Sequence, residues 1–330
     1  MADVVGFVLA VILGFVPMLF LAGILYWLDR YEKEPKLLLG GVFAWGAIVA
    51  VIGALIAQIL LGQGVLILTG SAVAEEIASS SLFAPLTEEI FKGLAVLLIF
   101  IFFRHEFDSV LDGIIYAGVV ALGFAATEDV LYYFSSYAED GLGGMLVLVF
   151  LRFVIFGWQH AFFTAFIGIG LAVTRLSKNI LIQLSAPLVG LGLAIFVHSL
   201  HNSLLTFLTG MAGLSAAVVF AWTGWLMMGT FIFWLIYREK RWLSEHLREE
   251  VQLGVISNHQ FQSASELFGQ TRASLAALGD GRFHQTRRFF QLCGELAHKK
   301  RQLASLGDEQ GNQQLIASLR AELAQLSAGL

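Results

Sequence analysis

Long apolar runs separated by short polar connections fill the first 237 residues of the chain. A helix needs about 20 consecutive, mostly apolar residues to cross the hydrocarbon core of a bilayer, and seven runs reach that length. They lie at residues 4–28, 37–61, 82–103, 110–134, 145–174, 180–208 and 212–237. The pattern predicts an all-α fold, a polytopic membrane helical bundle of about seven spans.

Lysine and arginine residues fall in alternate connections between these runs. The first, third and fifth connections and the segment after the last run carry them, whereas the other connections carry none. The basic residues of the connections are Arg30, Lys33, Lys36, Arg104, Arg175 and Lys178. Because positively charged connections stay in the cytoplasm, we expect the N-terminus outside and the C-terminus in the cytoplasm.

The composition changes after Tyr237, where Gln, Arg, Glu and Ala appear at helical spacing. We therefore divide the chain into a membrane-embedded domain, 1–237, and a small cytoplasmic helical tail, 238–330. Two amphipathic segments of the tail, 282–306 and 313–329, could pair as a hairpin or mediate self-association. The basic residues of the first segment form either a solvated face or a contact with anionic lipid headgroups.

Composition excludes a soluble globular protein. Hydrophobic residues make up 57% of the chain and charged residues only 14%, and the mean hydropathy is +0.76, far from the usual balance of soluble domains. The net charge of -5 is spread along the chain, which argues against nucleic acid as a partner. A single cysteine, Cys293, excludes an internal disulfide framework.

Ionisable and amide side chains interrupt several of the apolar runs. Such groups are costly inside a membrane, so they normally face a protein-lined cavity and mark chemistry or transport. With the predicted orientation, most of them lie at a similar depth in the outer half of the membrane, and His160 lies nearer the middle. The residues are Glu88, Glu89, Lys92, Glu128, His160, His198, His201 and Asn202.

The spacing of these residues indicates acid, base and hydrogen-bond donor roles. Glu88 and Lys92 are four residues apart and share a helix face, while Glu89 points about 100° away, so we expect only one of the two acids to pair with Lys92. His198 and Asn202 also share a face and could donate hydrogen bonds to a developing oxyanion. A carboxylate base, a trapped water and such donors are what amide hydrolysis needs.

Four motifs in this order resemble those of the PrsW family of bacterial intramembrane proteases. They are EEIFK from Glu88, the FxxxE motif ending at Glu128, QHAFFTAFIGIGLA containing His160, and HSLHN from His198 to Asn202. The family is more distantly related to CAAX prenyl endopeptidases and to bacteriocin-processing membrane proteins. The resemblance begins at the first connection, DRYEKEP, and ends before the tail.

The resemblance implies an intramembrane endopeptidase of the bacterial inner membrane that cuts a membrane-anchored protein, such as an anti-sigma factor. By the same resemblance, Glu88 activates water with support from Glu89, and Glu128, His160, His198 and Asn202 complete the catalytic set. Asp129 departs from the Asn expected after the second-motif glutamate. Glu128, His160 and His198 could hold zinc with an open position for water, whereas the related endopeptidases suggest glutamate-activated water without a metal.

Two functions of other classes compete with proteolysis. A proton- or cation-coupled transporter would also carry membrane carboxylates and histidines, but the chain lacks the similar halves that many transporters have. A catalytically silent sensor or scaffold would not need the complete set of costly polar residues. Among the other polar residues, Arg152 is expected to pair with Glu128 or Asp129, and His201 to pack or border the cavity.

Overall fold

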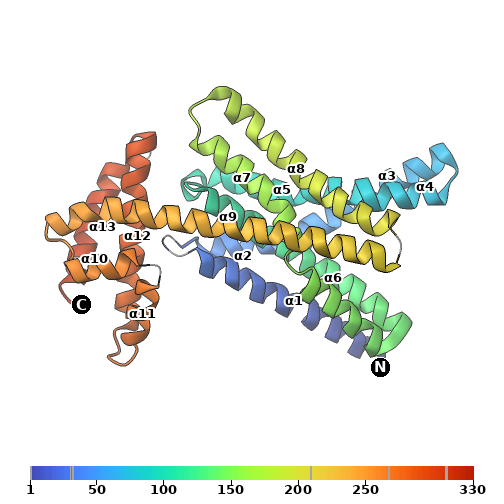
Figure 1. Ribbon diagram of the computed structural model, residues 1–330, viewed down its shortest axis with the longest axis horizontal. Coiled ribbons are helices and arrows are strands. Elements are labelled where there is room, and N and C mark those ends of the chain that lie inside the picture. Colours follow the sequence, from blue (N-terminus) through green and yellow to red (C-terminus); the bar gives the residue numbers. More distant parts are fainter. Residues whose placement is uncertain (1, 30, 32, 209, 267, 309–310) are drawn as a thin grey trace. The chain divides into compact units, whose positions relative to one another are not determined.

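The computed structural model describes residues 2–29, 31, 33–208, 210–266, 268–308 and 311–330, and no strand occurs among them. The all-α prediction is confirmed. The chain divides into two compact units (Figure 1): unit 1 is Met1–Trp27 with Glu34–Thr230, and unit 2 is Leu28–Lys33 with Phe231–Leu330. Both units contain part of α9, Gly210–Gln252, which continues through the predicted domain border at residue 237. Arg30, used to predict orientation, lies outside the described residues.

Unit 1 contains helices α1 to α8 and the first part of α9. Short π-helical turns, which are wider than an α-helix, link α2 to α3 (η1, Trp45–Ala50) and α4 to α5 (η2, Ser79–Phe83), and a third follows α6 (η4, Phe150–Ile155). The helices are α1 (Ala2–Leu28), α2 (Lys36–Ala44), α3 (Val51–Thr69), α4 (Ala72–Ala78), α5 (Ala84–Phe102), α6 (Val110–Val149), α7 (Gln159–Leu176) and α8 (Ile180–Phe207).

Five helical stretches among the described residues are long and apolar enough to cross a membrane. One of them, Val110–Leu176, contains both the fourth and the fifth predicted spans, and α5 is not among the five. α5 is apolar apart from three charged residues that lie close together, Glu88, Glu89 and Lys92, whereas the five stretches each contain a membrane-length segment with at most two. The membrane character of the chain is therefore confirmed, whereas the count of seven spans stays a prediction. The other four stretches are Val4–Leu28, Lys36–Thr69, Ile180–Phe207 and Gly210–Gln252.

The first half of α6 forms the centre of unit 1. Every residue from Leu111 to Ala126 is buried, as expected for a helix that is apolar all round. Close packing against α7 depends on two glycines, because a Cβ atom on Gly113 would collide with the backbone of Gly168, and one on Gly168 would collide with Gly113. This contact of two backbones fixes the register of α6 against α7.

A sharp corner at Gly141 reverses the second part of α6. Gly141 has a φ of 69°, a left-handed conformation that favours glycine. After the corner the helix returns along its own first part, so that Met145 packs against Val130 and Tyr133. A separate break lies further on, where helix gives way to turn between η4 and α7 at residues 156–158. This break interrupts the predicted fifth span, 145–174.

Unit 2 is a small helical domain made of the end of α9 and four further helices. The two amphipathic segments of the tail pair with each other, since Arg288 of α12 bonds Glu322 of α13 at 3.0 Å. A buried carboxylate, Glu250 of α9, accepts bonds from Lys300 and Arg320, both at 2.7–2.8 Å. The four helices are α10 (Asn258–Ser265), α11 (Gly269–Ala276), α12 (Phe283–Leu306) and α13 (Asn312–Ser327).

Candidate functional site

A cavity of about 570 Å³ lies within unit 1, between helices that are far apart in the sequence. Side chains from α1, α3, α5, α6, α7 and α8 and from the π-helical turns η2 and η4 line it. The structure brings five of the six predicted site residues to its wall. These five are Glu88, Glu128, His160, His198 and Asn202.

Lys92 joins the two neighbouring acids of α5. Its Nζ atom lies 3.1 Å from Glu88 Oε2 and 3.0 Å from Glu89 Oε1. The prediction that only one acid pairs with Lys92 is therefore wrong. A four-carbon side chain reaches both the residue three positions before it and the residue four positions before it, since both lie on adjacent turns. The ammonium also lies 4.1 Å from the centre of the Phe124 ring.

Glu89, the sixth predicted residue, lies behind the cavity wall. It is fully buried, and its three bonds go to Lys92, to His198 Nδ1 at 2.9 Å, and to the hydroxyl of Thr164 at 2.8 Å. Sequence reasoning missed Thr164. The signal was present, because Thr164 follows His160 by four residues and so shares its helix face. The two adjacent acids thus occupy different environments, one at the cavity and one enclosed.

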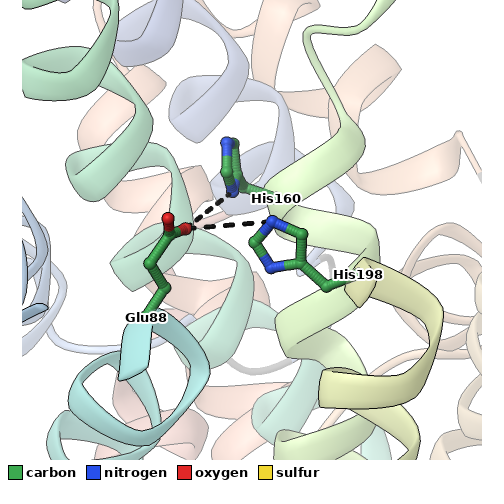
Figure 2. A group of neighbouring side chains, drawn as sticks. All are labelled: Glu88, His160 and His198. Atoms are coloured by element: carbon green, nitrogen blue, oxygen red, sulfur yellow. Dashed lines mark ion pairs between the residues drawn. The ribbon is translucent and has the colours of Figure 1, made fainter. Parts of the chain in front are cut away.

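Glu88, His160 and His198 form a cluster at the cavity (Figure 2), with one side chain each from α5, α7 and α8. Glu88 Oε2 lies 3.9 Å from His160 Nδ1 and 3.9 Å from His198 Nε2. One ligand atom from each of the three residues lies within 4.8 Å of the others. Ligands of a tetrahedral zinc ion lie about 3.4 Å apart, so a small contraction would let these three atoms hold a cation.

Both imidazoles of the cluster are oriented by a second carboxylate. His160 Nε2 lies 3.0 Å from Glu128 Oε2, and His198 Nδ1 lies 2.9 Å from Glu89 Oε1. A carboxylate accepts the proton of the nitrogen that faces it, which leaves a lone pair on the other nitrogen of each ring. The lone pair of His160 Nδ1 faces the Lys92 ammonium at 3.1 Å, and that of His198 Nε2 faces Glu88. This carboxylate–histidine arrangement is the one that surrounds histidine ligands of metal ions, so the donor set fits a metal.

The predicted metal ligands and the observed cluster differ in one carboxylate. Glu128, which sequence reasoning grouped with the two histidines, contacts the outer nitrogen of His160 instead, and Glu88 takes the inner place. Spacing along the chain could not distinguish these positions, because both acids reach the same cavity. The ligand role of Glu128 stays a prediction, and the structure favours Glu88.

Arg152 from the π-helical turn η4 bonds both acids of the second motif. Its Nη2 donates to Glu128 Oε2 and its Nε to Asp129 Oδ1, as expected for the partner of these residues. Asp129 also accepts a bond from the Tyr133 hydroxyl at 3.1 Å, and the guanidinium carbon lies 4.2 Å from the centre of the Tyr132 ring. The additional acid at position 129 is therefore compensated by a cation nearby.

The bonded cluster nevertheless has an excess of negative charge. It contains two cations, Lys92 and Arg152, and four carboxylates, which leaves two negative charges uncompensated when all six groups are ionised and both imidazoles are neutral. Uncompensated charge is costly away from water. One divalent cation, or a proton on each imidazole, would balance it. The carboxylates are Glu88, Glu89, Glu128 and Asp129.

Asn202 ties α8 to the π-helical turn that precedes α5. Its Nδ2 donates to the Ser80 carbonyl at 3.0 Å, and the hydroxyls of Ser80 and Thr206 lie 3.3 Å apart. One hydrogen of the amide remains for another acceptor. His201 is buried at the cavity wall among the rings of Phe156 and Phe163, as expected for a packing residue.

Three proteins similar to this chain are proteases by name. A "Protease PrsW" from Geobacillus kaustophilus is 30% identical over 155 residues, which are 47% of this chain and 62% of the relative. A second, from Clostridioides difficile, is 37% identical over 114 residues, which are 34% of this chain and 46% of the relative. A third, from Oceanobacillus iheyensis, is 29% identical over 204 residues, which are 58% of this chain and 80% of the relative. The match thus spans less than two thirds of the Geobacillus protein. No solved structure matches the chain.

The family model described as "PrsW family intramembrane metalloprotease" matches residues 34–235. That range contains the whole cavity cluster, from Glu88 to Asn202, and all four motifs. It covers more than half of the chain, and the chain therefore belongs to the PrsW family of intramembrane metalloproteases.

Proposed function

We propose that this protein is an intramembrane endopeptidase that hydrolyses a peptide bond in a membrane-anchored protein. One observation carries the proposal: Glu88 lies at the wall of a cavity inside an apolar helical unit, opposite two imidazoles that are each held by a second carboxylate. Such a cavity can hold water and a peptide carbonyl together. Family membership supports the same activity.

Glu88 is the base that takes a proton from the attacking water. The polar contacts found for Glu88 in the described part of the chain run through Oε2, which leaves Oε1 to accept a proton. Positioned carboxylates act in this way when they lie within hydrogen-bond reach of the water. Glu89 supports the reaction from behind the wall, where it holds Lys92 and His198 in place.

A metal ion, for which we propose zinc, would be held by Glu88, His160 and His198. When bound it would polarise the substrate carbonyl and make the water more acidic. Glu89 and Glu128 would orient the two histidines through their outer nitrogens. Arg152 would keep Glu128 in that orientation.

Asn202 supplies a hydrogen bond to the oxyanion that develops on the substrate carbonyl. The amide lines the cavity, and its bond to Ser80 uses only one of its two hydrogens. A preorganised donor at this position stabilises the transition state more than the ground state. His198 cannot donate to the same oxyanion while its Nδ1–H bonds Glu89, because Nε2 then carries a lone pair.

The substrates and the cellular setting follow from the family resemblance. We propose a bacterial inner-membrane protein with its N-terminus outside and its C-terminus in the cytoplasm, acting on single-span proteins of the anti-sigma-factor kind. The tail, whose two amphipathic helices pair within the chain, would associate with a second copy through its remaining exposed surface.

The test is proteolysis in reconstituted membranes of a panel of single-span proteins from the same cell. Wild type is compared with Glu88→Gln, which keeps the shape of the side chain and removes its charge. Glu76→Gln is the matched control, because Glu76 is an exposed acid on α4. Each protein is tested with and without a zinc chelator, and folding is checked by size-exclusion chromatography.

A cut that disappears in Glu88→Gln and persists in Glu76→Gln supports the protease. Loss of the cut with the chelator, reversed by added zinc, supports the metal. A cut that survives Glu88→Gln would refute the role of Glu88. A folded wild type that cuts none of the panel and carries ions across the membrane would favour the coupled transporter.

A further inference from the structure

The cavity of unit 1 extends along α5 to both sides of Glu88. On one side, Gln58 of α3 lines the cavity and donates to the hydroxyl of Thr87 at 3.3 Å, so it lies at the level just before Glu88. On the other side, the Phe124 ring of α6 lines the cavity and lies over the ammonium of Lys92, one turn beyond Glu88. The cavity therefore has two ends, with the catalytic cluster between them.

Hydrogen-bonding side chains line the end at the start of α5. Asn202 of α8 donates to the Ser80 carbonyl at 3.0 Å, and the hydroxyls of Ser80 and Thr206 lie 3.3 Å apart. Together with Gln58, these three residues belong to the cavity wall. A peptide at this end meets groups that can pair with its backbone or with polar side chains.

Aliphatic and aromatic side chains line the end beyond Glu88. Val51 and Ala54 of α3 belong to the same buried cluster as Phe124, and both precede Gln58 by one to two turns. Ala125 comes from α6, directly after Phe124. All four of these apolar residues line the cavity, whereas Lys92 is fully enclosed behind the wall.

Met18 of α1 completes the wall of this apolar end. It reaches the level of Ala125 because Gly14, one turn earlier, packs against the backbone of Ala126, and Leu25, two turns later, packs against Gly118. Five apolar side chains from three helices thus surround one end of the cavity.

The apolar end has the composition of a binding pocket for an apolar side chain. Ala54 and Ala125 end at Cβ, so they leave room between the longer side chains of the wall. Burying an aliphatic side chain there is favourable by the hydrophobic effect, whereas a charged side chain would lose its hydration without gaining a partner. The pocket is continuous with the cavity in which Glu88 lies.

We propose that Met18, Val51, Ala54, Phe124 and Ala125 form a subsite for an apolar side chain of the substrate, such as leucine, on the membrane side of the cut bond. This inference rests on the proposed protease function and names the residues that select the substrate. The residues on the other side of the cut bond lie at the polar end, beside Gln58 and Asn202. The cut therefore falls where an apolar span gives way to polar sequence.

Two measurements on the full chain in neutral detergent test the subsite. In the first, blocked tripeptides with Ala, Leu, Phe or Lys between two serines are added, and binding is measured by the rise in unfolding temperature. In the second, the same four residues are placed on the membrane side of a cut found in the panel of single-span proteins. An apolar pocket discriminates about tenfold or more per methylene, so leucine should exceed alanine and lysine by at least about tenfold.

Two substitutions should shift this preference in opposite directions. Ala125→Val narrows the subsite and should shift the preference toward alanine, whereas Met18→Ala widens it and should shift the preference toward phenylalanine. Ala121→Val is the matched control, because Ala121 lies one turn before Ala125 on α6, is fully buried, and is not among the described residues of the cavity wall. A general loss of stability would not produce opposite shifts.

Opposite shifts in the two variants, with the wild-type order kept in Ala121→Val, support the subsite. A wild type without preference for apolar residues would overturn it, as would the same shift in Ala121→Val. Ordered binding of the tripeptides by a protein that cuts nothing would support the subsite and refute the protease. Cuts that ignore the residue on the membrane side would support the protease and refute the subsite.

Discussion

Replacing Lys92 with Met should make the cavity cluster bind zinc more tightly. The ammonium of Lys92 lies 3.1 Å from Glu88 Oε2 and 3.1 Å from His160 Nδ1, so it contacts two of the three atoms that would hold the ion. Two unit charges 4 Å apart repel by about 4 kcal/mol at an effective dielectric constant of 20, and a divalent ion doubles this repulsion. In wild type the ammonium must move aside or tolerate this repulsion.

The same substitution should destabilise the metal-free protein. Lys92 is fully buried and balances part of the charge of Glu88 and Glu89. Removing one partner of a buried ion pair lowers the free energy of unfolding by about 3–5 kcal/mol.

The expected gain in zinc affinity is smaller than the full repulsion, because movement of the ammonium relieves part of it in wild type. We expect the affinity of Lys92→Met for zinc to rise by about tenfold to a thousandfold, where each factor of ten corresponds to about 1.4 kcal/mol.

The assay is competition for zinc with a chromophoric chelator in detergent, together with thermal unfolding with and without zinc. Lys178→Met, which removes an exposed lysine before α8, is the control and should behave as wild type. Lys92→Met should unfold at a lower temperature without zinc and recover with it, since ligand binding to the folded state stabilises it. Zinc affinity equal to or below that of wild type would refute the competition between the ammonium and the ion.

Three further predictions concern stability and packing. Arg152→Gln leaves Glu128 and Asp129 without their shared cation and should lower the free energy of unfolding by about 3 kcal/mol. Adding Asp129→Asn should restore part of that stability, and a double variant that is even less stable would contradict the charge argument. Gly168→Ala should lower the free energy of unfolding by about 2 kcal/mol or more, because the new Cβ meets the backbone of Gly113. Gly192 has open space around it, so Gly192→Ala should be tolerated. Thermal unfolding of the two variants checks both expectations. Burial raises the pKa of the Cys293 thiol, and the charge of Glu250 raises it further, so maleimide should label Cys293 at neutral pH only after unfolding; rapid labelling of the folded chain, followed by mass spectrometry, would refute its burial.

Much of the site was predictable because its residues are conspicuous in an apolar background. Glu88, Glu128, His160, His198 and Asn202 each interrupt a long apolar run, and the depth at which they do so placed them together. The pairing of Arg152 with the second-motif acids followed in the same way. Rare polar residues inside a membrane carry more positional information than polar residues in a soluble protein.

The details of the cluster were not predictable, because side-chain reach decides them. Helical spacing gives the direction of Glu88 and Glu89 but not the span of the Lys92 side chain, which bonds both. Apolar runs also conceal breaks, since residues 156–158 are as apolar as the helices around them. The choice of Glu88 over Glu128 beside the two histidines depends on how α5, α6, α7 and α8 pack, which no local pattern contains.

The position of the corner at Gly141 sets the depth at which Arg152 meets the acids of the second motif. Asp129 precedes it by twelve residues and Arg152 follows it by eleven, so two helical arms of nearly equal length, about 18 Å and 16 Å at 1.5 Å per residue, return the guanidinium to the depth of the acids. Inserting one residue into the second arm would turn Arg152 by about 100° and displace it by about 1.5 Å. Insertions on either side of the corner therefore show how much displacement of Arg152 the ion pairs with Glu128 and Asp129 tolerate.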